Sequence, residues 1–177
     1  MSVRTSHESS YATATLTRSA RADALAARLE AGANALITLA HSLSDAEWRR
    51  TIPGDGRKIG VVVHHVGSMY QLEMQFAAQL AGGSAIVGVT MMDINAVNAR
   101  HAADFDSVGK EEAISFVRTN SRDAANAIRD LSDRELDTAA PISLYGDAPL
   151  TCQFFLEDHP VRHSYHHVAR IRAALNR

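Results

Sequence analysis

Residues 158–168 read Asp158-His159-Pro160-Val161-Arg162-His163-Ser164-Tyr165-His166-His167-Val168. Two of these histidines, His163 and His167, are four positions apart in a helical pattern. Such positions lie about 40° apart around a helix axis, so both imidazoles can face one point. A second pair, His64 and His65, lies upstream in an apolar run. The two clusters predict a helical fold with a metal site divided between two helices.

Apolar residues elsewhere in the chain recur at three-and-four spacing, which is the period of a helix. This spacing predicts helices over residues 21–43, 59–80, 92–103, 110–131 and 150–175. Pro53-Gly54-Asp55-Gly56 predicts a turn. Little of the chain reads as strand, and the segment that contains Pro141, Gly146 and Pro149 reads as a connection. The sequence therefore predicts an all-α fold.

A short motif occurs twice, each time directly after a long predicted helix. Ser44 with Glu47, and Ser132 with Glu135, form capping boxes, each of which starts a short helical turn. A loop and a histidine-bearing helix follow each of them. This echo predicts two helix-loop-helix halves, whose antiparallel packing gives a four-helix bundle. The long segments between the halves argue against an up-down order with short loops.

The chain has 177 residues and 46% hydrophobic content, which suits one domain over residues 20–177. Residues 1–19 are rich in Ser and Thr, show no hydrophobic period and predict a flexible tail. The formal charge is −2, and there is no dense Lys/Arg run, so we expect no nucleic-acid partner.

No stretch has the apolar length of a membrane span, and residues 1–20 lack the apolar run of a secretory signal, so we expect a soluble, cytoplasmic protein without a membrane partner. The single cysteine, Cys152, cannot form an internal disulfide, which fits a reducing compartment. Beside Phe154 and Phe155 it is predicted to be a packing residue, with a reactive thiol as the alternative.

Helix phase separates the neighbouring histidines. His65 shares an apolar stripe with Val62 and Val66, whereas His64 falls on the row of Ser68. We therefore expect His65 to point inward and His64 to lie on a polar face.

The same argument divides the histidines of the last helix. His163 and His167 share a face with Ile171, whereas His159 and His166 share a more polar face. We expect His163 and His167 to be the inward pair.

Three inward imidazoles need partners, because an unpaired buried ring nitrogen costs about 1–3 kcal/mol. A divalent ion held by His65, His163 and His167 would remove that cost. The alternative is three separate core histidines, each bonded to a carbonyl or to a carboxylate such as Glu73 or Asp158. Three histidines without a fixed fourth ligand form an open site, which is typical of catalysis. Neutral imidazoles suit Zn, Ni, Fe or Cu, and the sequence does not choose among them.

Other residues are candidates for the surroundings of this site. Glu73, Tyr70, Asn95, Asn98 and His101 could support the ligands, or they could form a solvated or interhelical polar row. A separate set of methionines is predicted to fill the core: Met69, Met74, Met91 and Met92. Asp158 and Glu157 are predicted to cap or solvate a bend near Pro160.

The spacing of His163, His166, His167 and Ile171, together with the upstream run over residues 59–66, resembles the DinB-like superfamily. That superfamily includes bacillithiol transferases and mycothiol-dependent maleylpyruvate isomerases. The resemblance extends over residues 20–176 and includes Leu43-Ser44-Asp45-Ala46-Glu47-Trp48.

The resemblance implies an antiparallel four-helix bundle with a long crossover connection and short extra helices, assembled as a homodimer. It implies His65, His163 and His167 as ligands of one divalent metal ion, with Zn or Ni ahead of Fe.

It also implies a low-molecular-weight thiol as cosubstrate and a small-molecule substrate, so that the protein would be an S-transferase or an isomerase. A hydrolase that activates water and a non-catalytic metal-binding stress protein are the alternatives. The specific maleylpyruvate isomerase activity is disfavoured, because His163 stands where those enzymes have Glu. The Gly-Gln often found after the last histidine is replaced by Val168-Ala169-Arg170.

Overall fold

The computed structural model of the chain describes residues 19–177 and is mainly helical. Its elements are α1 (Ala20–Ser42), α2 (Asp45–Trp48), α3 (Ile59–Ala81), α4 (Met91–Asp104), α5 (Lys110–Arg129), α6 (Asp133–Asp137), β1 (Ala139–Ile142), β2 (Ala148–Thr151), α7 (Cys152–Leu156) and α8 (Arg162–Ala174). The first four predicted long helices are confirmed to within two residues at each end. The predicted tail lies outside the described residues except for Ser19, whose hydroxyl caps α1 by accepting a hydrogen bond from the Ala22 amide.

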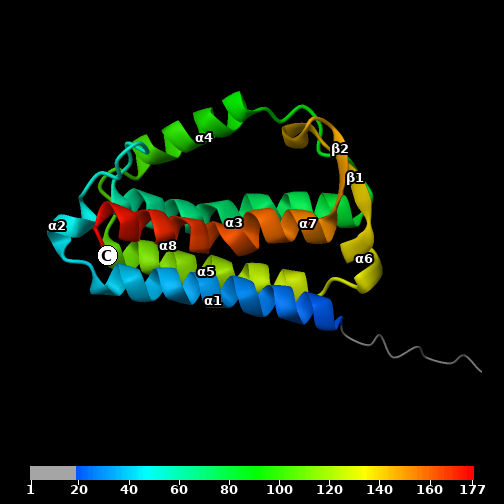
Figure 1. The fold of residues 1–177 in the computed structure, drawn as a ribbon, viewed down its shortest axis with the longest axis horizontal. Coiled ribbons are helices and arrows are strands. Elements are labelled where there is room, and N and C mark those ends of the chain that lie inside the picture. Colours follow the sequence, from blue (N-terminus) through cyan, green and yellow to red (C-terminus); the bar gives the residue numbers. More distant parts are fainter. Residues whose placement is uncertain (1–18) are drawn as a thin grey trace, which may run out of the picture.

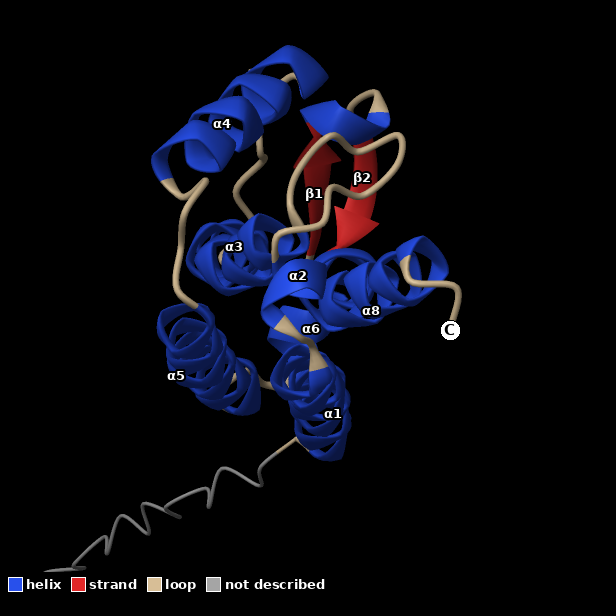
Figure 2. Ribbon diagram, turned by 90° about the vertical axis from the view of Figure 1, so that its left-hand side faces the viewer, coloured by secondary structure: helices blue, strands red, loops and turns tan. Residues whose placement is uncertain are grey.

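The long helices α1, α3 and α5 form a four-helix bundle with the continuous rod of α7 and α8 (Figures 1 and 2). The helices α1 and α8 run in one direction, and α3 and α5 run in the other (Figure 1). The connection from α3 to α5 contains α4. It carries the chain back to the end of the bundle at which α3 begins (Figure 1). Asn120 of α5 donates a hydrogen bond of 2.9 Å to the Gly67 carbonyl of α3. The predicted all-α bundle with a long crossover is confirmed.

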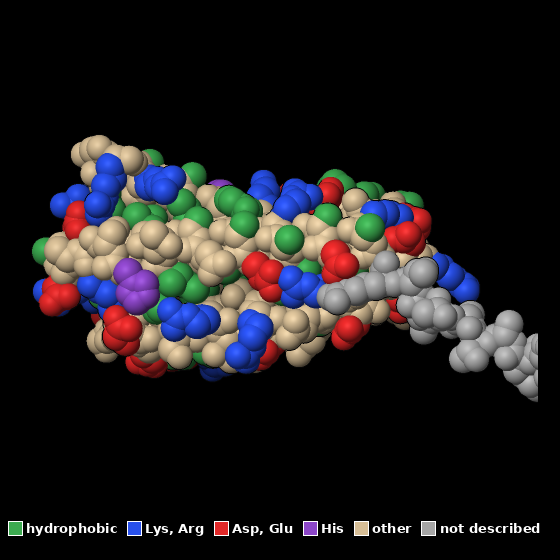
Figure 3. All heavy atoms as spheres, turned by 90° about the horizontal axis from the view of Figure 1, so that it is seen from below, with side chains coloured by type: hydrophobic (Ala, Val, Ile, Leu, Met, Phe, Trp, Pro, Cys, Tyr) green, Lys and Arg blue, Asp and Glu red, His purple; other side chains and the backbone are tan. Residues whose placement is uncertain are grey.

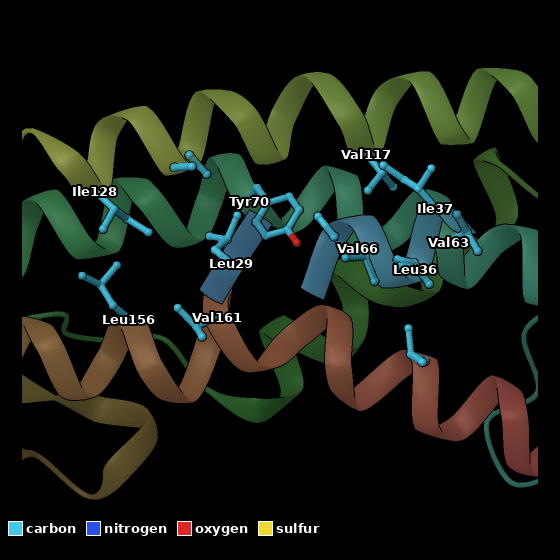
Figure 4. Packing of buried hydrophobic residues seen from close by; sticks show 14 of the residues in the cluster. Leu29, Leu36, Ile37, Val63, Val66, Tyr70, Val117, Ile128, Leu156 and Val161 are labelled. Carbon is cyan, nitrogen blue, oxygen red and sulfur yellow. The ribbon is translucent and has the colours of Figure 1, made fainter. Parts of the chain in front are cut away.

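Buried aliphatic side chains fill the space between the four helices (Figure 4). Leu29 and Leu36 of α1, Val66 of α3 and Val117 of α5 belong to this cluster, and all four are fully buried. Each such side chain stabilises the fold by about 1.5–3 kcal/mol relative to exposure. Tyr70 also lies in this core, where its hydroxyl is 2.6 Å from the Ser164 hydroxyl. This pair fixes α3 against α8.

The two predicted capping boxes are present at the starts of α2 and α6. Ser44 and Ser132 each accept a hydrogen bond from the backbone amide of the glutamate three residues on. A third box, Thr90 with Asp93, starts α4 in the same way. Each box fixes the point at which the chain leaves a loop and enters a helix.

The helix α4 lies outside the bundle, beside α3, and has no fully buried residue (Figure 2). The prediction that Met91 and Met92 fill the core is therefore wrong, because their side chains are 59% and 77% exposed in the first turn of α4. Met69 and Met74 of α3 are half-buried.

The segment read as a plain connection contains a β-hairpin, which corrects that prediction. β1 and β2 pair antiparallel, with Pro141 opposite Pro149. Gly146 takes a left-handed conformation with φ of 65° in the turn between them. The outer edge of β1 is bridged by the loop at Ile86, whose amide donates to the Pro141 carbonyl at 2.9 Å. These long-range bonds hold the hairpin in place, and no local pattern signals them.

The last predicted helix is also corrected. It begins at Cys152 rather than near residue 150, because residues 148–151 belong to β2. It is interrupted by a π-helical turn over Glu157–Val161, which contains Pro160. Proline has no amide hydrogen, so the regular hydrogen-bond ladder cannot continue through it, and the turn widens. The bend was expected at Pro160, but its π-helical form was not.

Cys152 is fully buried, and its Sγ lies 3.4 Å from the Ala77 carbonyl oxygen. Burial raises the pKa of its thiol to about 11, as expected for a packing residue. Within residues 19–177, no helix combines the length and the hydropathy needed to cross a membrane. On the face seen in Figure 3, acidic and basic side chains are interspersed.

Candidate metal centre

The structure brings together the three histidines that helix phase selects. His65 lies in α3, and His163 and His167 lie in the first two turns of α8. One ligand nitrogen from each lies within 4.8 Å of those from the other two. The ring centre of His65 is 5.2 Å from that of His163 and 5.6 Å from that of His167. Two antiparallel helices thus present three imidazoles to one point.

The environment of these rings favours the neutral imidazole that a metal requires. Burial, followed by the neighbouring His163, lowers the pKa of His65 far below its usual value and that of His167 to about 2. The Nδ1 atoms of His65 and His167 are buried without a hydrogen-bond partner among residues 19–177. Buried lone pairs without partners are costly, and coordination would satisfy them. The donor set therefore fits a divalent metal ion.

Glu73 supports the third histidine. His163 Nδ1 lies 2.7 Å from Glu73 Oε1, and the Glu73 carboxylate is almost fully buried. With Nδ1 donating to this carboxylate, Nε2 of His163 keeps a free lone pair for a metal ion. The sequence left open the alternative that each histidine is a core residue bonded to a carbonyl or a carboxylate. His163 has such a bond, and the bond leaves its other ring nitrogen able to bind a metal ion.

Two charged residues near the site were missed by sequence reasoning. Arg57 lies close enough to contribute to the lowered pKa values of His65 and His167. Its guanidinium is held by Asp55, with Nε 2.6 Å from Oδ1, and Asp55 also pairs with Arg170 at 2.8 Å. In the sequence, Asp55 is only part of a turn signal. Its pairing with Arg170 depends on the tertiary fold and has no local signature.

His64 does not lie on a solvated face, so that prediction is wrong. It is 4% exposed, and its ring stacks on Phe105 at 3.9 Å and on Phe116 at 4.6 Å. Its Nδ1 is 2.9 Å from Nε2 of His101 in α4. Helix phase correctly places His64 on a different side of α3 from His65. That side is covered by α5 and the crossover connection, so the His64 ring is buried.

His159 is likewise half-buried rather than on a polar surface, which corrects the prediction for it. Its ring packs on Phe155, and its Nε2 lies 2.9 Å from the Tyr145 hydroxyl. That hydroxyl also donates to Asp158, which the sequence assigned to the bend or to a bond with a core histidine. His166 is exposed, as predicted.

A cavity of about 240 Å³ opens onto His65 and His163. Its lining is mainly apolar and comes from α3, α4, the hairpin turn and the last helix. The lining residues are His65, Met69, Leu72, Glu73, Phe76, Met91, Ile94, Asn98, Leu144, Phe155, His159 and His163. The site thus lies at the seam of α3 and α8 beneath α4, where a small molecule can reach it.

Four other residues were candidates for supporting the site, and the structure places two of them near it. Asn98 and His101 of α4 face this region, and each has a buried polar atom without a partner among the described residues. Asn95 is exposed, and the Tyr70 hydroxyl bonds to Ser164 in the bundle core, so neither has a role in the site that the structure shows.

No family model matches the chain, and no curated protein matches it by sequence. Among solved structures, YfiT from Bacillus subtilis matches with a TM-score of 0.72 and 16% identity, over 88% of this chain and 86% of that one. The chain has the YfiT fold. YfiT is described as "a probable metal-dependent hydrolase with an unusual four-helix bundle topology".

Proposed function

We propose that this protein is a metal-dependent enzyme that activates a low-molecular-weight thiol for transfer to a small electrophilic substrate. The observation that carries the proposal is the triad of His65, His163 and His167 beside an apolar cavity. The ion would be Zn or Ni, with Fe as a further candidate. When bound, it supplies a Lewis acid that lowers the pKa of a thiol or of water.

The chain's own residues favour an anion at the open position. Three neutral imidazoles leave the charge of a dication uncompensated, so a fourth ligand with negative charge binds best. Glu73 orients His163, and the burial of His65 and His167 keeps both rings unprotonated at neutral pH. The apolar lining, which includes Met69, Leu72 and Phe76, limits the access of bulk water and suits a sulfur ligand.

Hydrolysis is the second candidate, because the description of YfiT names a hydrolase. The same triad could activate water, and the same cavity could hold the apolar part of an ester or amide. The two functions differ in whether a thiol is needed for turnover.

The test is a paired assay of metal-loaded protein. One arm combines glutathione, mycothiol or bacillithiol with a panel of electrophiles, and the other arm presents esters and amides without thiol. We expect thiol-dependent conjugation, reduced at least about a hundredfold by His163→Ala and retained in His166→Ala, a matched exposed histidine in the same helix. Thiol-independent ester hydrolysis that depends on His163 would replace the thiol proposal with a hydrolase. Activity that survives His163→Ala would contradict both.

A further inference from the structure

A fourth histidine lies beside the triad without belonging to it. The ring of His101 in α4 is centred 5.5 Å from that of His65, a spacing similar to those within the triad. Among the described residues, however, the group whose ligand atoms lie within 4.8 Å of one another contains only His65, His163 and His167. His101 is therefore placed to contact a ligand bound at the triad, and it is not a further member of the triad.

His64 holds His101 in this position. The two rings are joined by the 2.9 Å contact between His64 Nδ1 and His101 Nε2. His64 is itself fixed between Phe105 and Phe116, which stack on its ring. Since Nε2 of His101 is occupied, Nδ1 is its remaining polar atom. That atom is buried and has no hydrogen-bond partner within residues 19–177.

A second polar atom without a partner lies one turn earlier on the same helix. Asn98 lines the cavity together with His65 and His163, and its Oδ1 is buried without a bond to any described residue. Asn98 and His101 are three positions apart and so share one face of α4. Unpaired buried polar atoms are costly, and two of them on one face mark a place where a polar ligand group would bind.

We propose that His101 donates a hydrogen bond from Nδ1–H to the anionic atom that occupies the open position of the metal centre. This inference rests on the proposed function, in which that atom is a thiolate sulfur. His64 then donates its Nδ1–H to His101 Nε2, which fixes the His101 proton on Nδ1. The pair from α3 and α4 thus selects anions over neutral ligands. It also gives α4 a role in binding, although α4 contributes no residue to the bundle core.

The test is a binding titration of the cobalt(II)-loaded protein, followed by visible absorption, with azide and 2-mercaptoethanol as probes. His101→Phe removes the donor, and His64→Phe keeps the stacking but removes the bond that fixes the tautomer. His101→Gln keeps an N–H, and His166→Phe is the matched exposed control. We expect one cobalt per chain in all variants. The dissociation constants for both probes should rise about tenfold or more in His101→Phe. His64→Phe should show a smaller rise, His101→Gln a partial recovery, and His166→Phe no change.

An azide affinity within twofold of wild type in His101→Phe would overturn the assignment. Loss of cobalt from the same variant would overturn it as well, since His101 would then be a ligand of the metal. If wild type binds azide in a His101-dependent way but shows no sulfur-to-cobalt absorption with 2-mercaptoethanol, the hydrogen bond stands and the thiol function fails. The two probes therefore separate failure of this inference from failure of the proposed function.

Discussion

At the scale of single residues, the orientation of His163 depends on Glu73. The carboxylate is buried in α3, two turns beyond His65, and accepts from His163 Nδ1 at 2.7 Å. Its charge makes the imidazole a better donor to a metal and holds the ring in one tautomer. Glu73 acts through His163 and is a positioning residue.

We therefore expect Glu73→Gln to weaken metal binding about 10–100-fold while leaving the fold intact. The affinity can be measured by competition with a chromophoric chelator. Glu111→Gln, which changes an exposed carboxylate in the first turn of α5, is the control and should have no effect. An unchanged metal affinity in Glu73→Gln would show that the contact is incidental.

At the scale of elements, α2 is fixed to the start of α3 by one close approach. The Trp48 indole donates to the Val108 carbonyl at 3.0 Å, and its ring covers Gly60. A Cβ atom on Gly60 would lie 2.4 Å from the indole ring, well inside contact distance. Glycine is therefore needed in this first turn of α3, in spite of its low helix propensity.

Gly60→Ala should destabilise the protein by about 1–3 kcal/mol, because the overpacking of a fixed indole outweighs the gain in helix propensity. Chemical denaturation followed by circular dichroism measures the change. Gly82→Ala, at the end of α3, places its Cβ at an ordinary 3.5 Å from the nearest atoms and serves as the control. Equal stability of the two variants would argue against a fixed Trp48.

Element boundaries were predictable where the cause is local. The capping boxes of Ser44 and Ser132 and the apolar periods of α1, α3 and α5 depend on neighbours in sequence. The hairpin depends on hydrogen bonds between Ile86 and β1, which are far apart in the chain. The burial of His64 depends likewise on Phe105 and Phe116 from other elements. Helix phase gave the direction of each histidine but could not say what covers it.

At the scale of the whole molecule, the buried histidines make stability depend on pH. The folded-state pKa values of His65, His167 and His101 lie below the usual value, mainly because of burial. Each ring is neutral when folded and takes up a proton on unfolding below about pH 6.5. The unfolded state then binds more protons, so stability is fully present above that pH and falls as the pH decreases.

We expect the free energy of unfolding, measured in the presence of chelator, to fall by about 4–6 kcal/mol between pH 7 and pH 5, because each of the three rings contributes about 2 kcal/mol. This window lies above the range in which ordinary carboxylates titrate. His167→Leu should reduce the slope, whereas His41→Ala, which removes an exposed histidine of α1, should not change it. If the free energy of unfolding of the wild-type protein did not change between pH 7 and pH 5, the burial of His65 and His167 in the neutral form would be contradicted.

The sequence did not predict where the crossover connection lies relative to the bundle. The sequence shows the length of the connection from α3 to α5, but the position of α4 on the outer side of α3 follows from the assembled bundle (Figure 2). That position brings Asn98 to the wall of the cavity and places the ring centre of His101 5.5 Å from that of His65. The triad itself was predictable because His65, His163 and His167 follow the period of their own helices.

The most direct test of the account is the metal content of protein purified without added metal. Elemental analysis should find close to one divalent ion per chain in the wild type and in His166→Ala, and little in His163→Ala or His167→Ala. Full metal content in both of the latter variants would contradict the three-histidine centre on which the proposed function depends.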